Sequence, residues 1–121
     1  MKNTFVRFTN LVQKLYAEQS TECAEVDALL AHIYAQNESN VPVCITDLVR
    51  AERFGTLPTL SKRLQDMEKR GLVKISTGTD RRTRLVQVAA GGVQLLESRA
   101  MLLSEAAAAE ERQRKALKSA A

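Results

Sequence analysis

The chain has 121 residues, of which 45% are hydrophobic and 26% are charged, a composition typical of one folded globular domain. Its net charge is +4, and aromatic residues make up only 4%, which argues against a base-stacking platform for single-stranded nucleic acid. No apolar run approaches the ~20 residues that span a bilayer, and the first five residues lack the apolar centre of a signal peptide. We therefore expect a cytoplasmic protein.

The positive charge is concentrated in the middle of the chain. Residues 1–46 have a net charge of −2, residues 47–88 one of +5 and residues 89–121 one of +1. An alternative for Lys69, Arg70 and Lys74 is that they are ordinary solvated surface residues that bind no polyanion. This alternative applies most strongly to Lys74. A basic segment in the middle of the chain is nevertheless where a polyanion would dock.

Two amphipathic helices are predicted at the start of the chain. The first covers residues 4–19, where Phe5, Phe8, Val12 and Leu15 recur at helical spacing. Each phenylalanine gains ~1.5–3 kcal/mol on burial, so this helix either folds back on its own domain or, as we favour, meets a second subunit. Ser20 and Thr21 then mark a break and a cap. The second helix ends near residues 37–40 and has an apolar stripe of Val26, Leu29, Leu30 and Ile33.

A pair of short helices is predicted next. Thr46 offers an N-cap hydroxyl and Asp47 a first-turn negative charge, so a helix should begin there and stop at Gly55. Thr56 then caps a second helix, in whose first turn Pro58 is tolerated. This second helix ends at residue 71 and buries a stripe of Leu60, Leu64 and Met67.

A β-hairpin is predicted after these helices. Residues 72–75 and 85–88 are strand-like, and the loop between them contains Gly78, Asp80, Arg81, Arg82 and Arg84. Asp80 is expected to shape the loop by pairing with an arginine; an Asp80–Arg84 surface ion pair that leaves the tip mobile is the alternative. Residues 41–45 form a short extended piece that could add a first strand to this sheet.

The segment from residue 26 to residue 96 resembles the winged helix-turn-helix of the multiple-antibiotic-resistance regulator (MarR) family. The resemblance depends on the run ERFGTLPTLSKRLQDMEKRGLVK, followed by TDRRTRLVQVAAGG. It implies a mainly α fold with a small antiparallel β-hairpin wing. Thr83 stands where an acidic residue is common in the family, and Ala89 where a threonine usually caps the next helix. The chain is also shorter than most members, so its dimerisation helices and ligand pocket are expected to differ.

The resemblance and the charge distribution together predict contacts with double-stranded DNA. With the apolar stripe turned inward, the helix over residues 57–70 presents groups that can bond bases or phosphates. The two arginines at the hairpin tip could enter a minor groove. The predicted DNA-binding residues are Thr46, Thr56, Pro58, Thr59, Ser61, Lys62, Gln65, Arg81, Arg82 and Arg84. Taken alone, the polar helix face would suit an ordinary solvated surface.

The rest of the chain is predicted to be helical from Val93, with two apolar stripes and a tail beyond Glu110 that frays. One stripe can cover the parent domain and the other can meet a second copy. We thus expect one domain, with a winged core at residues 21–90 and dimerisation helices at residues 1–20 and 91–121. We expect it to act as a homodimeric regulator, most simply a repressor on a palindromic operator. The alternative is a winged-helix protein-interaction module that does not bind specific DNA.

Catalysis and cofactors have little support in the sequence. His32 is the single histidine, and no triad, phosphate loop or metal-ligand spacing is present, so we expect no enzyme, no cofactor and no metal. Cys23 and Cys44 match neither a disulfide framework nor a zinc site, although a redox role for Cys23 near a helix start is an alternative to packing. The resemblance is compatible with a small-molecule effector, which the sequence does not identify.

Overall fold

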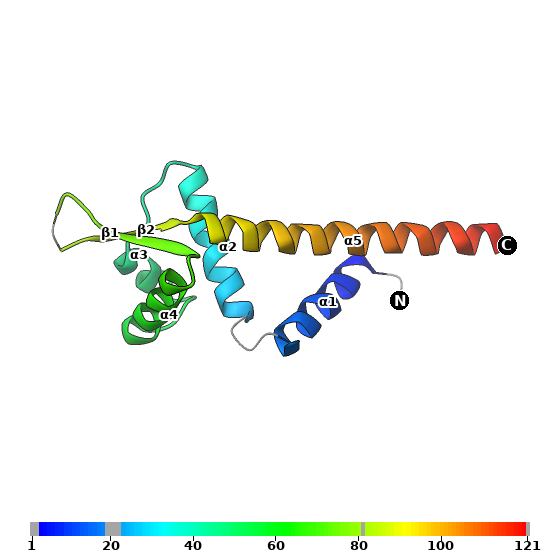
Figure 1. Cartoon of the computed structure of the whole chain (residues 1–121), viewed down its shortest axis with the longest axis horizontal. Helices are drawn as coiled ribbons and strands as arrows, with labels where there is room; N and C mark the ends of the chain where they lie inside the picture. The colour runs from blue at the N-terminus through cyan, green and yellow to red at the C-terminus, as the bar shows by residue number, and fades with distance from the viewer. Residues whose placement is uncertain (1–2, 19–22, 81, 121) are drawn as a thin grey trace. The chain divides into compact units, whose positions relative to one another are not determined.

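The computed structural model describes residues 3–18, 23–80 and 82–120. The elements in these ranges are α1 (Thr4–Glu18), α2 (Ala24–Glu38), α3 (Ile45–Arg50), α4 (Leu57–Lys69), β1 (Val73–Thr77), β2 (Arg84–Val88) and α5 (Ala90–Ala120) (Figure 1). The mainly α fold with one antiparallel hairpin is therefore confirmed. The chain divides into two compact units, Ala24–Leu96 and Met1–Cys23 with Glu97–Ala121. The predicted boundaries of the winged core and of the dimerisation helices stay predictions.

The Ala24–Leu96 unit is built around an apolar core to which α2, α3, α4 and the hairpin all contribute. Its largest fully buried side chains are Leu29, Leu30, Ile33, Leu48, Leu60, Leu64, Met67 and Val86. Helix α4 packs against α3 and β1, while α2 packs against β2. The apolar stripes predicted for α2 and α4 are confirmed as the faces that these helices bury, as expected for amphipathic helices on one core.

The start and end of α3 differ from the prediction. The N-cap is Cys44, not Thr46, because Cys44 has an extended backbone and its carbonyl accepts hydrogen bonds from the N–H groups of Asp47 and Leu48. Thr46 therefore lies inside the first turn. The helix ends at Arg50, not at Gly55, because Glu52 adopts a left-handed φ of 56° that breaks the helix. Gly55 has a φ of 103° and turns the chain into α4 instead.

The hairpin matches the prediction closely. Its two strands pair antiparallel, with Val73 opposite Val88 and Thr77 opposite Arg84. The extended piece before α3 adds only an isolated bridge between Cys44 and Leu85, together with a 2.8 Å hydrogen bond from the N–H of Val86 to the carbonyl of Val43. The piece does not form a third strand. Pro42, which directly precedes the two contacting residues, has no N–H with which to extend the pairing.

Helix α5 begins at Ala90, three residues earlier than predicted, and continues to Ala120. The carbonyl of Ala89 accepts hydrogen bonds from the N–H groups of Gly92 and Val93, which starts the first turn. The residues beyond Glu110 are helical as far as Ala120, and the fraying of this tail stays a prediction. None of the helices in the described ranges has the length and apolar character needed to cross a membrane.

In the second unit, α1 packs on the later turns of α5. The Nη2 atom of Arg7 donates to Oε1 of Gln113 at 2.7 Å and lies 3.5 Å from Oε2 of Glu110, which is only 5% exposed. The guanidinium of Arg99 lies over the ring of Tyr16. Helix α1 therefore folds back on its own chain, but not with its whole apolar stripe: Val12 is buried, whereas Phe5 is 71% exposed. The predicted break at Ser20 and Thr21 lies outside the described residues.

Candidate nucleic-acid interface

Helix α4 exposes polar side chains on the side opposite its buried stripe. Thr56, the N-cap, has extended φ and ψ of −74° and 166°, and Pro58 lies in the first turn. Because the stripe formed by Leu60, Leu64 and Met67 faces the core, the residues on the other side of α4 point outward. Those predicted to contact DNA are exposed at Thr56, Pro58, Thr59, Lys62 and Gln65 and half-buried at Ser61. These side chains are accessible to a ligand. Their contacts with DNA stay predictions.

The entrance to α4 is organised by its two threonines. The hydroxyl of Thr56 donates to the hydroxyl of Thr59 at 3.3 Å, and the side chain of Thr56 makes no capping hydrogen bond to the helix. Both hydroxyl groups are exposed at the surface, where a threonine hydroxyl can donate to a phosphate oxygen or can donate to or accept from a base edge. Thr46, by contrast, is exposed in the first turn of the shorter helix α3.

The tip of the hairpin is held by the backbone. The N–H of Thr83 donates to the carbonyl of Asp80, and the N–H of Gly78 donates to the carbonyl of Thr83. The carboxylate of Asp80 shapes the loop as predicted, but it does so by accepting from the backbone N–H of Arg82 at 3.1 Å, an Asx-type turn contact; among the described arginines, none forms the expected ion pair with it. Arg82 and Arg84 are exposed, and Arg81 lies outside the described residues.

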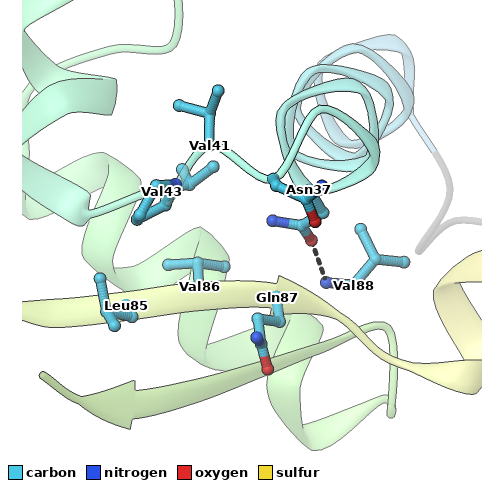
Figure 2. A pocket seen from close by; sticks show the side chains of 9 residues that line it. Asn37, Val41, Val43, Leu85, Val86, Gln87 and Val88 are labelled. Carbon is cyan, nitrogen blue, oxygen red and sulfur yellow. Dashed lines mark hydrogen bonds between the residues drawn. The ribbon is translucent and has the colours of Figure 1, made fainter.

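The hairpin is tied to its neighbours through the N–H groups that point away from the strand pair. On the β2 side, the N–H of Val86 donates to Val43, and the N–H of Val88 donates to Oδ1 of Asn37 in α2 at 3.0 Å (Figure 2). On the β1 side, the N–H of Ile75 donates to Oε2 of Glu68 in α4 at 2.8 Å. The wing is therefore anchored to α2 and to α4, the helix predicted to read DNA.

Neither Asn37 nor Glu68 was among the residues singled out from the sequence. Both are polar residues near the C-terminal end of a helix, where polar residues are common and carry no signal of their own. Their role depends on which strand amide the fold brings opposite them. Sequence spacing alone does not contain that information.

Two open pockets border these elements. One, of about 470 Å³, lies between β2 and the turn after α2 and is lined by Asn37, Val41, Val43 and Gln87 among others (Figure 2). The other, of about 390 Å³, lies where α2, the loop before α4 and α4 itself meet. It is lined by Glu25, Arg53, Phe54, Thr59 and Arg63 among others.

The remaining reactive side chains fit structural positions. The ring of His32 packs on that of Phe54 with centroids 5.2 Å apart, and the guanidinium of Arg53 covers the same ring. Cys23 and Cys44 are free and half-buried. Among residues 3–18, 23–80 and 82–120, no three histidine, cysteine or carboxylate side chains come together as a metal site.

Comparison with known proteins finds similarity in structure, not in sequence. No family model matches the chain, and no curated protein matches it. A mutant of Staphylococcus aureus MepR bound to an oligodeoxyribonucleotide is similar with a TM-score of 0.70 and 22% identity, over 92% of this chain and 86% of that one. A crystal structure of the S. aureus MepR–DNA complex gives 0.67 and 22%, over 97% and 96%. A cysteine-to-serine mutant of MarR from E. coli gives 0.62 and 18%, over 94% and 90%.

Proposed function

We propose, from the MarR-type winged-helix fold that this chain shares with these regulators, that it is a homodimeric transcription regulator that binds double-stranded DNA sequence-specifically. The observation that carries the proposal is the link between Glu68 and Ile75, which anchors a hairpin with exposed Arg82 and Arg84 to the helix that exposes Lys62 and Gln65. A recognition helix and a wing that are held in a fixed arrangement can contact the same DNA duplex at the same time.

Each part of this surface has a separate task in the proposal. Helix α4 enters the major groove, where Gln65 can pair with adenine and Lys62, nearer the N-terminus, with guanine or a phosphate. The arginines of the wing lie along the adjacent minor groove, whose negative potential attracts guanidinium groups. Residues 47–88, with a net charge of +5, contribute most of the affinity through phosphates.

The pairing of two subunits is assigned to α1 and the later part of α5. These helices use Arg7, Glu110 and Gln113 to hold each other within one chain. They still expose large apolar side chains at Phe5, Val6, Met101, Leu103 and Leu117. Exposed apolar side chains are the groups that a second copy could cover, and a contiguous apolar patch on a surface typically marks a protein–protein contact. A two-fold dimer would place two α4 helices about one DNA turn (~34 Å) apart on a palindromic operator, and bound there it would block transcription as a repressor.

Regulation by a small molecule completes the proposal. One of the similar structures is S. aureus MepR bound to ethidium bromide, with a TM-score of 0.64 and 22% identity. In this chain the 390 Å³ pocket is the candidate effector site, because Thr59 belongs both to its lining and to the exposed face of α4. An effector that binds there should weaken DNA binding, and Arg63→Gln should change the effector concentration required when the loss of binding is expressed relative to that variant's own DNA affinity without effector.

The test of DNA binding is a selection from random duplexes followed by salt titration. A regulator of this kind should enrich a two-fold symmetric site, and the logarithm of its binding constant should fall linearly with the logarithm of salt concentration. The rival reading, a winged-helix module for protein contacts, predicts little affinity for any duplex even at low salt. That result would overturn the proposal.

A further inference from the structure

Asp66 is an acidic residue in the most basic part of the chain. Residues 47–88 have a net charge of +5 but include five acidic residues, three of which are explained by the fold. Asp47 lies in the first turn of α3, where the helix dipole favours an acid, whereas Glu68 and Asp80 hold the wing through hydrogen bonds to its backbone. Among the described residues, no ion pair or side-chain hydrogen bond holds the carboxylate of Asp66.

The stability of α4 does not explain an acid at this position. Asp66 is exposed and lies in the last turn of the helix, which ends at Lys69. Because the C-terminal end of a helix carries a partial negative charge, a carboxylate there is weakly destabilising. A carboxylate on a surface that meets DNA also repels the phosphates. Asp66 is therefore unfavourable both for the helix and for general DNA affinity, unless a hydrogen-bond donor of the duplex meets it.

Asp66 lies on the side of α4 that also presents Lys62 and Gln65. At 100° per residue, Asp66 projects within about 40° of Lys62 and at least about 100° from every residue of the buried stripe. Lys62, Gln65 and Asp66 are all exposed, and together they span about 100° of the helix surface. Asp66 is one turn beyond Lys62, with about 5–6 Å between their Cβ atoms. A duplex whose bases meet Lys62 and Gln65 therefore also lies beside Asp66.

A carboxylate accepts hydrogen bonds and donates none, so it distinguishes between the bases. In the major groove, guanine presents only acceptors, thymine an acceptor and a methyl group, and adenine an acceptor beside its amino group, whereas cytosine presents the N4 amino donor. We infer that Asp66 is a specificity-determining residue that accepts a hydrogen bond from N4 of a cytosine in each half-site. This inference rests on the DNA-binding function proposed above. It adds a residue that the sequence did not single out and names the base that this residue favours.

The experiment exchanges each cytosine–guanine pair of the selected site, at one position of both half-sites at a time, for a deoxyuridine–adenine pair. This exchange turns the N4 donor into an O4 acceptor without adding the methyl group of thymine. Dissociation constants are measured by fluorescence anisotropy at one salt concentration for the unmodified protein, Asp66→Ala and Glu52→Gln. Glu52→Gln is the matched control, because Glu52 is an exposed acid of the same unit outside α4 and its replacement changes the net charge equally. Thermal melting checks the fold, and Asp66→Ala should be at least as stable as the unmodified protein.

At one position per half-site, the exchange should weaken binding by the unmodified protein and by Glu52→Gln at least about fivefold, the effect of losing one base contact. The same exchange should weaken binding by Asp66→Ala less than about twofold. The inference is overturned if no cytosine is sensitive, or if Asp66→Ala keeps the full loss.

Two further outcomes separate this inference from its alternatives. If Asp66→Ala strengthens binding to every duplex alike, the carboxylate acts only by repelling phosphates and the inference is overturned while the proposed function stands. If the unmodified protein binds no duplex even at low salt, the proposed function itself fails and this inference fails with it.

Discussion

The carboxylate of Glu68 in the last turn of α4 accepts a hydrogen bond from the backbone N–H of Ile75 in β1 at 2.8 Å. The N–H of Ile75 points away from the strand pair, so the contact satisfies a donor that β2 cannot reach. It joins the end of the candidate reading helix to the start of the wing. Glu68 is therefore one of the groups that fix the position of the wing relative to the candidate reading helix, beside the bonds that Val86 and Val88 donate on the β2 side.

Replacing Glu68 tests this link. Glu68→Ala removes the acceptor, whereas Glu68→Gln keeps an acceptor oxygen and removes the negative charge. Both variants lose the same repulsion between the carboxylate and DNA. The difference between their DNA affinities therefore isolates the hydrogen bond, which is worth about 1 kcal/mol. We expect Glu68→Ala to bind the selected site about three- to fivefold more weakly than Glu68→Gln, and the amide of Ile75 to exchange faster in the alanine variant. Equal affinity and equal exchange would contradict the link.

Gly92 tests the junction between the wing and α5. A Cβ atom at Gly92 would lie 2.2 Å from the carbonyl oxygen of Leu72 and 2.8 Å from a methyl group of Val88. Alanine normally favours a helix over glycine by about 1 kcal/mol, but this clash reverses the sign, and we expect Gly92→Ala to lower the free energy of unfolding by about 1–3 kcal/mol. Urea unfolding measures it. Gly78→Ala is the control, because its Cβ would meet nothing nearer than 3.5 Å.

Base readout and phosphate contact should separate in a mutation series. Lys62→Ala and Gln65→Ala should each weaken binding to the selected site by about ten- to a hundredfold more than to scrambled DNA, because a base contact is worth about 1–3 kcal/mol. Arg82→Ala should weaken both duplexes alike and reduce the salt slope by about 1. Gel-shift titrations at several salt concentrations measure both effects. Equal losses on both duplexes for Lys62→Ala and Gln65→Ala would argue against base readout.

The pair of Glu110 and Arg7 should stabilise the unit formed by α1 and α5. Glu110 is 5% exposed, so Glu110→Ala leaves the partly buried guanidinium of Arg7 with weaker compensation. We expect a loss of about 1–3 kcal/mol in the free energy of unfolding. Glu111→Ala is a matched control one residue away: its 3.6 Å pair with Arg114 is more than half exposed on both sides, and its loss should be below about 1 kcal/mol. Similar losses in the two variants would contradict the role of burial.

The exposed apolar residues of the same unit should control subunit association. Phe5→Ser and Met101→Ser remove two side chains that are each 71% exposed in the single chain, so folding of one subunit should change little. If they are covered by a second copy, the double variant should shift sedimentation from dimer towards monomer and weaken binding to a two-half-site duplex more than to a single half-site. Val41→Ser, on an exposed residue of the other unit, is the control.

The sequence by itself determined the elements and their buried faces. The spacing of Leu60, Leu64 and Met67 predicted the face that α4 buries, and Thr56 and Gly71 predicted its limits, because helix periodicity and capping act over a few residues. The resemblance to MarR-type regulators implied the fold that the similar structures share, and the charge distribution indicated which segment would meet a polyanion. Local chemistry was sufficient for the helices and their buried faces.

The tertiary structure decided how the elements are joined. Cys44 replaced Thr46 as the cap of α3 because a bridge to Leu85 holds its backbone extended, and Glu68 became the anchor of the wing because folding places it opposite a free amide. These contacts connect residues whose separation along the chain follows no local period. Each is selected by the burial of the whole core, which no short stretch of sequence encodes.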